Sequence, residues 1–164
     1  MPDAPAALDD LDLQLLALLQ HDASRSNQAL AQAAGVSPAT AMRRVRRLME
    51  AGVIERTVAV VAPQALGVGL SAVVEVTLDR QGAEHLDAFE ARAVAEAAVQ
   101  QCWRVSPGPD FVLVVHARDM PGYQALAQRL FTQDANVRNV KTYFAIKRAK
   151  FTTEVQGPDS GSEA

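Results

Sequence analysis

The chain has 164 residues, a formal net charge of −3 at pH 7 and 49% hydrophobic residues. This length suits one ordinary domain or two small ones, and the apolar fraction supports a buried core, which argues against a disordered protein. The single cysteine, Cys102, excludes an internal disulfide framework. The three histidines lie far apart without metal-ligand spacing, so we expect no metal and no cofactor.

The sequence shows no signal for membrane insertion or secretion. Its longest apolar runs, such as Val58–Ala62 and Phe111–Val115, are far shorter than the roughly 20 residues that cross a bilayer. The first ten residues are acidic and lack the basic and apolar regions of a secretory signal. We therefore expect a cytoplasmic protein with no membrane partner.

The first third of the chain predicts three helices. Leucines recur at helical spacing over Leu8–Leu19, with aspartates in the first turn, where the helix dipole favours negative charge. Ser26 is a candidate N-cap for a short helix over Asn27–Ala34, and Gly35 follows where a helix commonly ends in a left-handed residue.

A third helix is predicted directly after this glycine. Ser37 suits its N-cap and Pro38 its first position, where the missing N–H has no cost. The helix runs to about Glu50, and Gly52 closes it. Two short helices separated by three residues match a helix-turn-helix, whose second helix enters the DNA major groove.

The remaining sequence predicts a second domain. Val53–Ala62 is typical of a strand or β-ribbon, and Pro63–Gly69 of a connector. The pattern then runs strand, helix, strand, strand, helix, strand, over residues 70–78, 83–97, 99–106, 111–117, 121–132 and 137–147. This βαββαβ order predicts an α+β fold with a ferredoxin-like second domain. We expect a winged helix-turn-helix over 1–62, a linker over 63–69, the second domain over 70–155 and a disordered tail over 156–164.

The third helix carries an unusual density of positive charge. Arg43, Arg44, Arg46 and Arg47 fall within five residues, and Arg56 follows. A row of charges often only solvates a helix, but this segment contains just two acids, which cannot neutralise it by i,i+4 pairing. We therefore expect the helix to bind double-stranded DNA.

The predicted contacts divide by position along this helix. Ala39, Thr40 and Arg43 lie near its start, where small residues permit close approach, and are expected to discriminate bases. The remaining arginines are expected to contact phosphates; they are Arg44, Arg46, Arg47 and Arg56.

The second domain predicts self-association. A small sheet with helices on one face leaves its other face bare, and a second copy of the same sheet is the simplest cover. We expect Val99, Gln101 and Trp103 on one face of their strand, with Trp103 packing in the core or between copies, or else stacking on a ligand. Cys102 is expected to act as a small buried hydrophobe.

Four segments of the chain carry recognisable patterns. In order, they are LDDLDLQLLALLQHD, LAQAAGVSPATAMRRVRRLMEAGVI, VSPGPDFVLVVHARDMPGY and VKTYFAIK. Together they resemble the successive signatures of the Lrp/AsnC feast-or-famine transcriptional regulators. The resemblance covers nearly all of Leu8–Lys150. It implies a winged helix-turn-helix joined to a ferredoxin-like domain that oligomerises and senses amino acids or related metabolites. It also implies dimers that assemble into tetramers or octamers.

The resemblance implies an effector cleft between subunits. Its residues would come from the loop Ser106–Asp110 and from positions that match the family cleft, namely Met120, Tyr123, Thr142 and Tyr143. Asp110 either receives an effector's ammonium group or caps the turn before the next strand.

Three features depart from the family pattern. Pro107 stands where relatives usually have glycine, and Pro109 removes another N–H, which leaves the amides of Gly108 and Asp110. Arg104 either supplies a bidentate partner for a carboxylate instead or pairs with a nearby acid. Ser24–Arg25 stands where relatives more often have an arginine followed by an aliphatic residue. Whether Arg25 contacts a phosphate therefore stays an open question.

We therefore expect a sequence-specific DNA-binding transcriptional regulator that responds to an amino acid or related small metabolite and has no enzymatic activity. An alternative is a largely non-specific architectural DNA-binding protein, which the arginine row also fits. An enzyme or metabolite carrier on the second domain would require carboxylate pairs or a nucleophile with a neighbouring base, and neither appears in the sequence.

Overall fold

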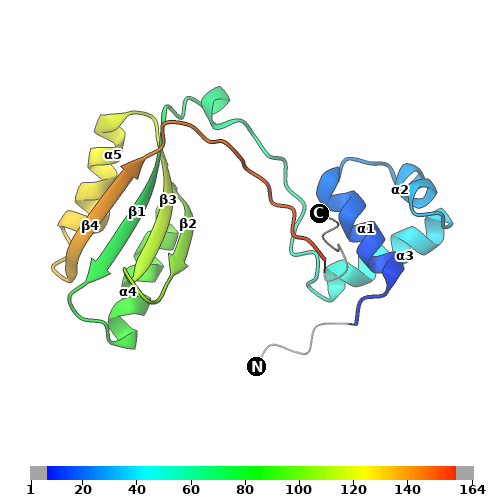
Figure 1. Cartoon of the computed structure of the whole chain (residues 1–164), viewed down its shortest axis with the longest axis horizontal. Coiled ribbons are helices and arrows are strands. Elements are labelled where there is room, and N and C mark those ends of the chain that lie inside the picture. The colour runs from blue at the N-terminus through cyan, green and yellow to red at the C-terminus, as the bar shows by residue number, and fades with distance from the viewer. Residues whose placement is uncertain (1–6, 158–164) are drawn as a thin grey trace, which may run out of the picture. The chain divides into compact units, whose positions relative to one another are not determined.

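The computed structural model describes residues 7–157 and divides into two compact units (Figure 1). The first unit comprises residues 1–59 together with 150–164, and the second comprises residues 60–149. Among the described residues, no helix is long and apolar enough to cross a membrane.

The first unit contains the predicted helix-turn-helix. Its helices are α1 (Asp10–His21), α2 (Asn27–Ala33) and α3 (Pro38–Glu50). Apolar side chains from all three form a small buried core, which is made of Leu15, Leu30, Ala31, Ala34 and Ala41. The three predicted helices and their order are confirmed.

Capping side chains fix where these helices begin. Ser26 and Ser37 accept hydrogen bonds at 3.2 Å from the backbone N–H groups three residues later, as N-caps of α2 and α3. Asp9 and Asp12 form a reciprocal capping box at the start of α1. In the turn before α3, Gly35 has a φ of 67°, a left-handed conformation that glycine adopts without strain.

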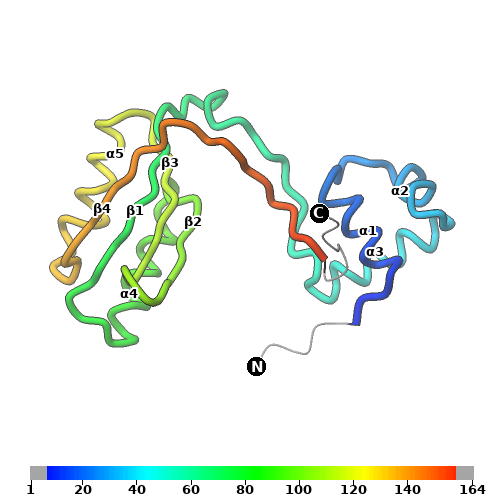
Figure 2. The backbone as a smooth tube through the Cα atoms, in the orientation of Figure 1, coloured from blue at the N-terminus to red at the C-terminus, as the bar shows by residue number. Residues whose placement is uncertain are grey.

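The predicted strand over Val53–Ala62 is wrong. The segment follows an irregular, extended path (Figure 2), and Val58, Val60 and Val61 are more than half exposed. Valines favour strands only when a neighbouring strand pairs with them, and no strand pairing involves this segment in the described part of the chain.

The end of the described chain makes contacts within the first unit. The side chain of Gln20 on α1 donates to the carbonyl of Val155 at 3.0 Å and accepts from its N–H at 2.7 Å. The predicted disordered tail falls largely on residues 158–164, which lie outside the described residues.

The second unit has the predicted βαββαβ order. After a short 3₁₀ turn (Pro63–Leu66), it contains β1 (Leu70–Leu78), α4 (Ala83–Ala95), β2 (Val99–Arg104), β3 (Phe111–Ala117), α5 (Met120–Ala127) and β4 (Val137–Phe144). A π-helical turn, Gln128–Thr132, extends α5. The strands form one antiparallel sheet in the order β2-β3-β1-β4, and both helices pack on the same face (Figure 1). This is the ferredoxin-like arrangement.

The predicted face of Val99 is wrong because β2 contains a bulge. The register with β3 shifts between Val99 and Gln101, so Val99 lies opposite the buried Val115 and packs against the core. Strict alternation predicts Val99 on the same face as Trp103, but one extra residue in the strand reverses the alternation. Cys102 also packs against the core, as predicted, and burial raises the pKa of its thiol.

Candidate DNA-binding and effector sites

Helix α3 turns one side to the core and the opposite side to solvent. Ala41 and Leu48 are buried at 0% and 1% exposure. At about 100° per residue, Ala39, Arg43 and Arg46 project away from that core side, and all three are exposed. The outer surface of α3 therefore carries small and basic side chains.

The four arginines of α3 are not equivalent. Arg46 pairs with Glu50 at 2.9 Å on the exposed surface, as the sequence spacing predicts. Arg43 has no ion pair among residues 7–157. The four guanidinium groups, with Asp9 and Glu50, line a shallow depression.

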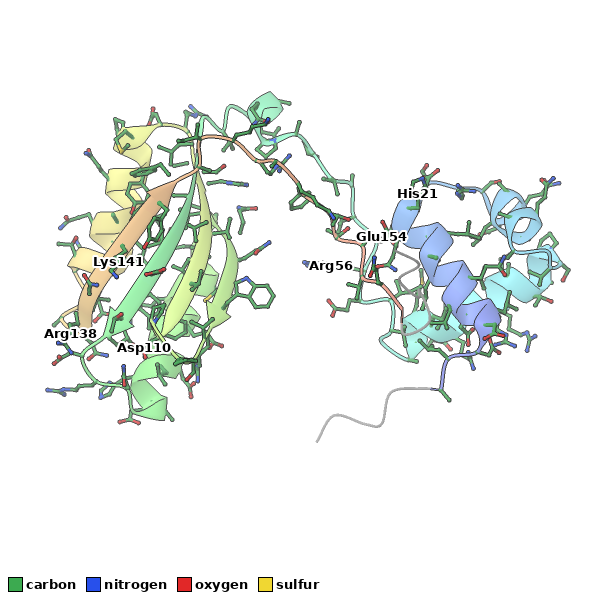
Figure 3. The ribbon with its side chains drawn as sticks, viewed as in Figure 1. His21, Arg56, Asp110, Arg138, Lys141 and Glu154 are labelled. Carbon is green, nitrogen blue, oxygen red and sulfur yellow. The ribbon has the colours of Figure 1, made fainter. Side chains whose placement is uncertain are left out.

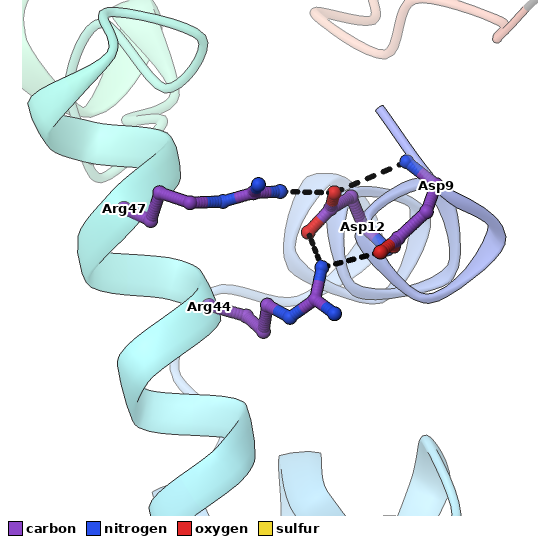
Figure 4. Close-up of polar contacts among 4 residues, drawn as sticks. All are labelled: Asp9, Asp12, Arg44 and Arg47. Carbon is purple, nitrogen blue, oxygen red and sulfur yellow. Dashed lines mark hydrogen bonds and ion pairs between the residues drawn. The ribbon is translucent and has the colours of Figure 1, made fainter. Parts of the chain in front are cut away.

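Arg44 and Arg47 extend toward α1 (Figure 4). Arg44 Nη1 donates to Asp12 Oδ1 at 3.2 Å and to Asp9 Oδ2 at 2.5 Å. Arg47 Nη2 donates to the other oxygen of Asp12. The expectation that Arg44 and Arg47 mainly serve phosphate contacts did not consider these partners, because they lie at the start of another helix more than 30 residues earlier.

The carboxylate of Asp12 is completely buried, at 0% exposure. It accepts hydrogen bonds from both arginines and from the backbone N–H of Asp9. The N–H of Asp12 and the guanidinium of Arg44 lower the pKa of Asp9, and Asp9 in turn raises the pKa of Arg44. These contacts hold α3 against the start of α1.

Two further arginines of the first unit differ in their surroundings. Arg25 Nε is buried, has no hydrogen-bond partner among residues 7–157 and lies 3.9 Å from Asp22 Oδ2. Arg56 lies in the exposed segment that follows α3 (Figure 3), with no ion pair in the described part of the chain. A phosphate contact by Arg56 stays a prediction, and whether Arg25 contacts phosphate stays open.

In the second unit, Arg104 is paired with acids of α4. Its Nη2 lies 2.6 Å from Asp87 Oδ1 and 2.7 Å from Glu90 Oε2, and its guanidinium lies 5.7 Å from the ring centre of Phe111. Asp87 and Glu90 raise its pKa. Of the two roles considered from sequence, the structure shows the pairing with nearby acids.

The loop that follows β2 offers few free amides. Asp110 accepts a hydrogen bond from the N–H of Leu78 at 2.7 Å, and its own N–H donates to the carbonyl of Val76. Asp110 (Figure 3) therefore joins the start of β3 to β1, a contact that differs from the local turn cap considered from sequence. Ser106 and Gly108 are exposed, and the N–H of Gly108 has no hydrogen-bond partner within residues 7–157.

The other predicted effector residues lie on both faces of the sheet. The hydroxyls of Tyr123 on α5 and Thr142 on β4 are 2.5 Å apart, on the helix-covered face. Phe144, which the sequence reasoning missed, packs edge-on against Tyr123 with ring centres 5.1 Å apart. Met120 is exposed at the start of α5, and Tyr143 points to the opposite, open face.

The open face of the sheet carries both apolar and charged side chains. Val114 on β3 lies opposite Val73 on β1, and Val112 lies opposite Glu75, which also lies opposite Lys141 on β4. Trp103 lies opposite Val112, and Tyr143 lies opposite Val73. Trp103 and Tyr143 are 59% and 53% exposed. Trp103 thus lies outside the core of its own chain.

This fold and this α3 surface define a regulator of the helix-turn-helix class with a ferredoxin-like second unit. Residues 8–49 match the AsnC-type helix-turn-helix domain, and residues 71–155 match the Lrp/AsnC ligand binding domain. The chain belongs to the Lrp/AsnC family, and it is a sequence-specific DNA-binding transcriptional regulator.

Similar proteins span nearly the whole chain. A helix-turn-helix transcriptional regulator of Haemophilus influenzae is 37% identical over 143 residues, 87% of this chain and 85% of that protein. The leucine-responsive regulatory protein of Rhizobium meliloti is 36% identical over 149 residues, 91% and 96% of the two chains. The feast or famine regulatory protein of M. tuberculosis, solved with L-methionine, has a TM-score of 0.82 and 31% identity, and the match covers 91% of this chain and 99% of that one.

Proposed function

We propose that this regulator contacts its operator through the outer surface of α3. Ala39, Thr40 and Arg43 contact base edges, because they lie near the helix start, where Ser37 and Pro38 bring the helix into the groove. The observation that supports this most directly is that Arg43 is exposed, has no ion pair within residues 7–157 and projects opposite the buried Ala41.

Phosphate contacts complete the operator complex. Arg46 is 82% exposed in its side chain, and its pairing with Glu50 is an exposed pair of the kind that exchanges readily for another anion. Arg56 follows on an exposed segment. The sequence also predicts phosphate contacts for Arg44 and Arg47, but their pairing with α1 supports a different role, developed below.

The effector in this proposal is an amino acid. Support comes from the match to a ligand binding domain and from relatives named for leucine or solved with L-methionine. Within one chain, the predicted effector residues lie in separate places: Arg104, Ser106, Gly108 and Asp110 near the loop, Met120, Tyr123 and Thr142 around α5, and Tyr143 on the open face. We therefore place the effector between subunits, where a second chain brings such groups together.

The subunit contact in this proposal is the open face of the sheet. A second copy seated on Val73, Trp103, Val112, Val114 and Tyr143 would bury their exposed apolar surface. Such dimers then assemble into tetramers or octamers. The function requires no catalytic step, and we place it in the cytoplasm.

DNA affinity measured at two salt concentrations tests this function. Fluorescence anisotropy with the protein's own promoter and with scrambled DNA should show tighter binding to the promoter at both concentrations, because base contacts survive salt better than phosphate contacts. Equal affinities for the two DNAs would instead support the architectural role.

A thermal-shift screen tests the effector. L-leucine and L-methionine should be examined first and the other amino acids next, since a ligand at about 100 times its Kd adds about 2.7 kcal/mol of stability. A flat response to all twenty would contradict an amino-acid effector without affecting the DNA result.

A further inference from the structure

Asp12 is a completely buried carboxylate in a unit that binds DNA, and it faces two arginines of the DNA-binding helix. A buried carboxylate is stable only when hydrogen bonds and opposite charges compensate its lost hydration. Arg44 and Arg47 provide both, one to each carboxylate oxygen. Asp9 gives Arg44 a second anionic partner at 2.5 Å.

These contacts withdraw the two arginines from solvent to different extents. The side chain of Arg44 is 23% exposed and that of Arg47 is 50% exposed, compared with 82% for Arg46. Arg44 and Arg47 lie three residues apart, on the side of α3 that faces α1. Two of the four arginines of α3 are therefore ion-paired with aspartates at the start of α1.

The pairing of Arg44 and Arg47 affects DNA binding because the first unit has a net negative charge. Residues 1–59 and 150–164 contain seven arginines and lysines against ten aspartates and glutamates, so few cations are left to attract DNA of any sequence. Non-specific DNA affinity depends on how many phosphates the free cations neutralise, whereas base contacts carry specificity.

We propose that Asp12 is a positioning residue that sets DNA specificity. By holding Arg44 and Arg47, it keeps two guanidinium groups off the phosphates of non-cognate DNA. Because Asp12 on α1 binds residues from two successive turns of α3, it also fixes the rotation of α3 about its axis. In this rotation Arg43 faces the DNA major groove. The carboxylate touches no DNA and acts only through the arginines.

The salt dependence of binding to scrambled DNA tests this role, because a residue that only stabilises the fold would not change it. Asp12→Asn removes the charge that holds Arg47 and one of the two charges that hold Arg44. Each arginine that then reaches a phosphate should steepen the slope of log K against log salt by about 0.9. With both released, the loss of affinity between 50 and 200 mM salt should grow about tenfold, and the preference for the promoter should fall.

Asp10→Asn is the matched control. Asp10 is exposed in the same turn of α1, and it has no ion pair within the described residues, so its substitution makes the same change in net charge without releasing an arginine. If Asp12→Asn and Asp10→Asn change the slope equally, only the overall charge matters and the proposal is overturned.

A second pair of variants decides the question even if Asp12→Asn does not fold. Arg44→Gln and Arg47→Gln in the otherwise unchanged protein should leave the slope on scrambled DNA as it is, whereas Arg56→Gln, at a proposed phosphate contact, should reduce it by about 0.9. A reduction of that size for Arg44→Gln or Arg47→Gln would show that these arginines already contact phosphate, and would refute the assignment to Asp12.

Discussion

Replacing Trp103 by alanine should separate the proposed dimer into monomers. Trp103 projects from the open face of the sheet, where its nearest side chain across the ladder is Val112. Its indole N–H donates to the side-chain oxygen of Gln101 on the same strand, at 3.1 Å. Because the residue makes no contribution to the core of its own chain, its loss should affect association far more than folding.

The exposed fraction of Trp103 sets the size of the effect. At 59% exposure, a tryptophan of about 250 Å² still has about 150 Å² to bury, worth about 3.7 kcal/mol at about 25 cal/mol per Å². A two-fold symmetric dimer buries two copies of Trp103, so the upper limit of their contribution to the dimerisation free energy is about 7 kcal/mol. Since area converts only partly into affinity, we expect about half of this, which raises the dimer Kd about 300-fold.

Sedimentation equilibrium of the wild type and Trp103→Ala over a range of concentrations measures this change. The chain has only one tryptophan, so its emission in the wild type should also shift to the red on dilution, as the indole becomes exposed. Val94→Ala is a suitable control, because Val94 is 66% exposed on α4, which covers the other face of the sheet. An unchanged dimer Kd for Trp103→Ala would refute the open face as the subunit contact.

Three further predictions concern local contacts. Ser37→Ala removes the N-cap of α3 and should cost about 1 kcal/mol of unfolding free energy and weaken promoter binding, whereas Ser37→Asn, which keeps a capping oxygen, should restore both in melting and anisotropy measurements. Tyr123→Phe leaves the Thr142 hydroxyl without its partner and should cost about 1 kcal/mol in urea unfolding; no change in the midpoint would show that the bond is not stabilising. Hydrogen bonds from Arg129 hold the pKa of Glu96 below its ordinary value of 4.5, so this pair stabilises the fold above that pH and the contribution is lost as pH falls through the lowered pKa. Arg129→Gln should therefore flatten the fall in Tm between about pH 5 and pH 3 while costing less than about 1 kcal/mol at pH 7, and parallel Tm profiles for the two proteins would contradict this.

Local signals in the sequence were sufficient to predict the three helices of the first unit and the βαββαβ order of the second. The caps Ser26 and Ser37 and the left-handed Gly35 each act within a few residues of their own position, so the sequence alone locates the helix-turn-helix. The strands and helices of the second unit likewise follow from side-chain periodicity. In both units, the determining interactions join residues that are near neighbours along the chain.

The sites depended on partners that the sequence spacing does not indicate. The carboxylate of Asp12 meets Arg44 and Arg47 across 32 and 35 residues, and Arg104 meets Asp87 across 17, so each pairing exists only once the helices and strands have packed. One bulge in β2 reversed the face of Val99, and a missing partner strand left residues 53–62 irregular. Apart from residues 53–62, sequence alone thus determined which segments are helix or strand, and it determined where the positive charge lies. Only tertiary packing decided which of those charges are neutralised, because burial and ion pairing depend on groups that folding brings together from distant parts of the chain.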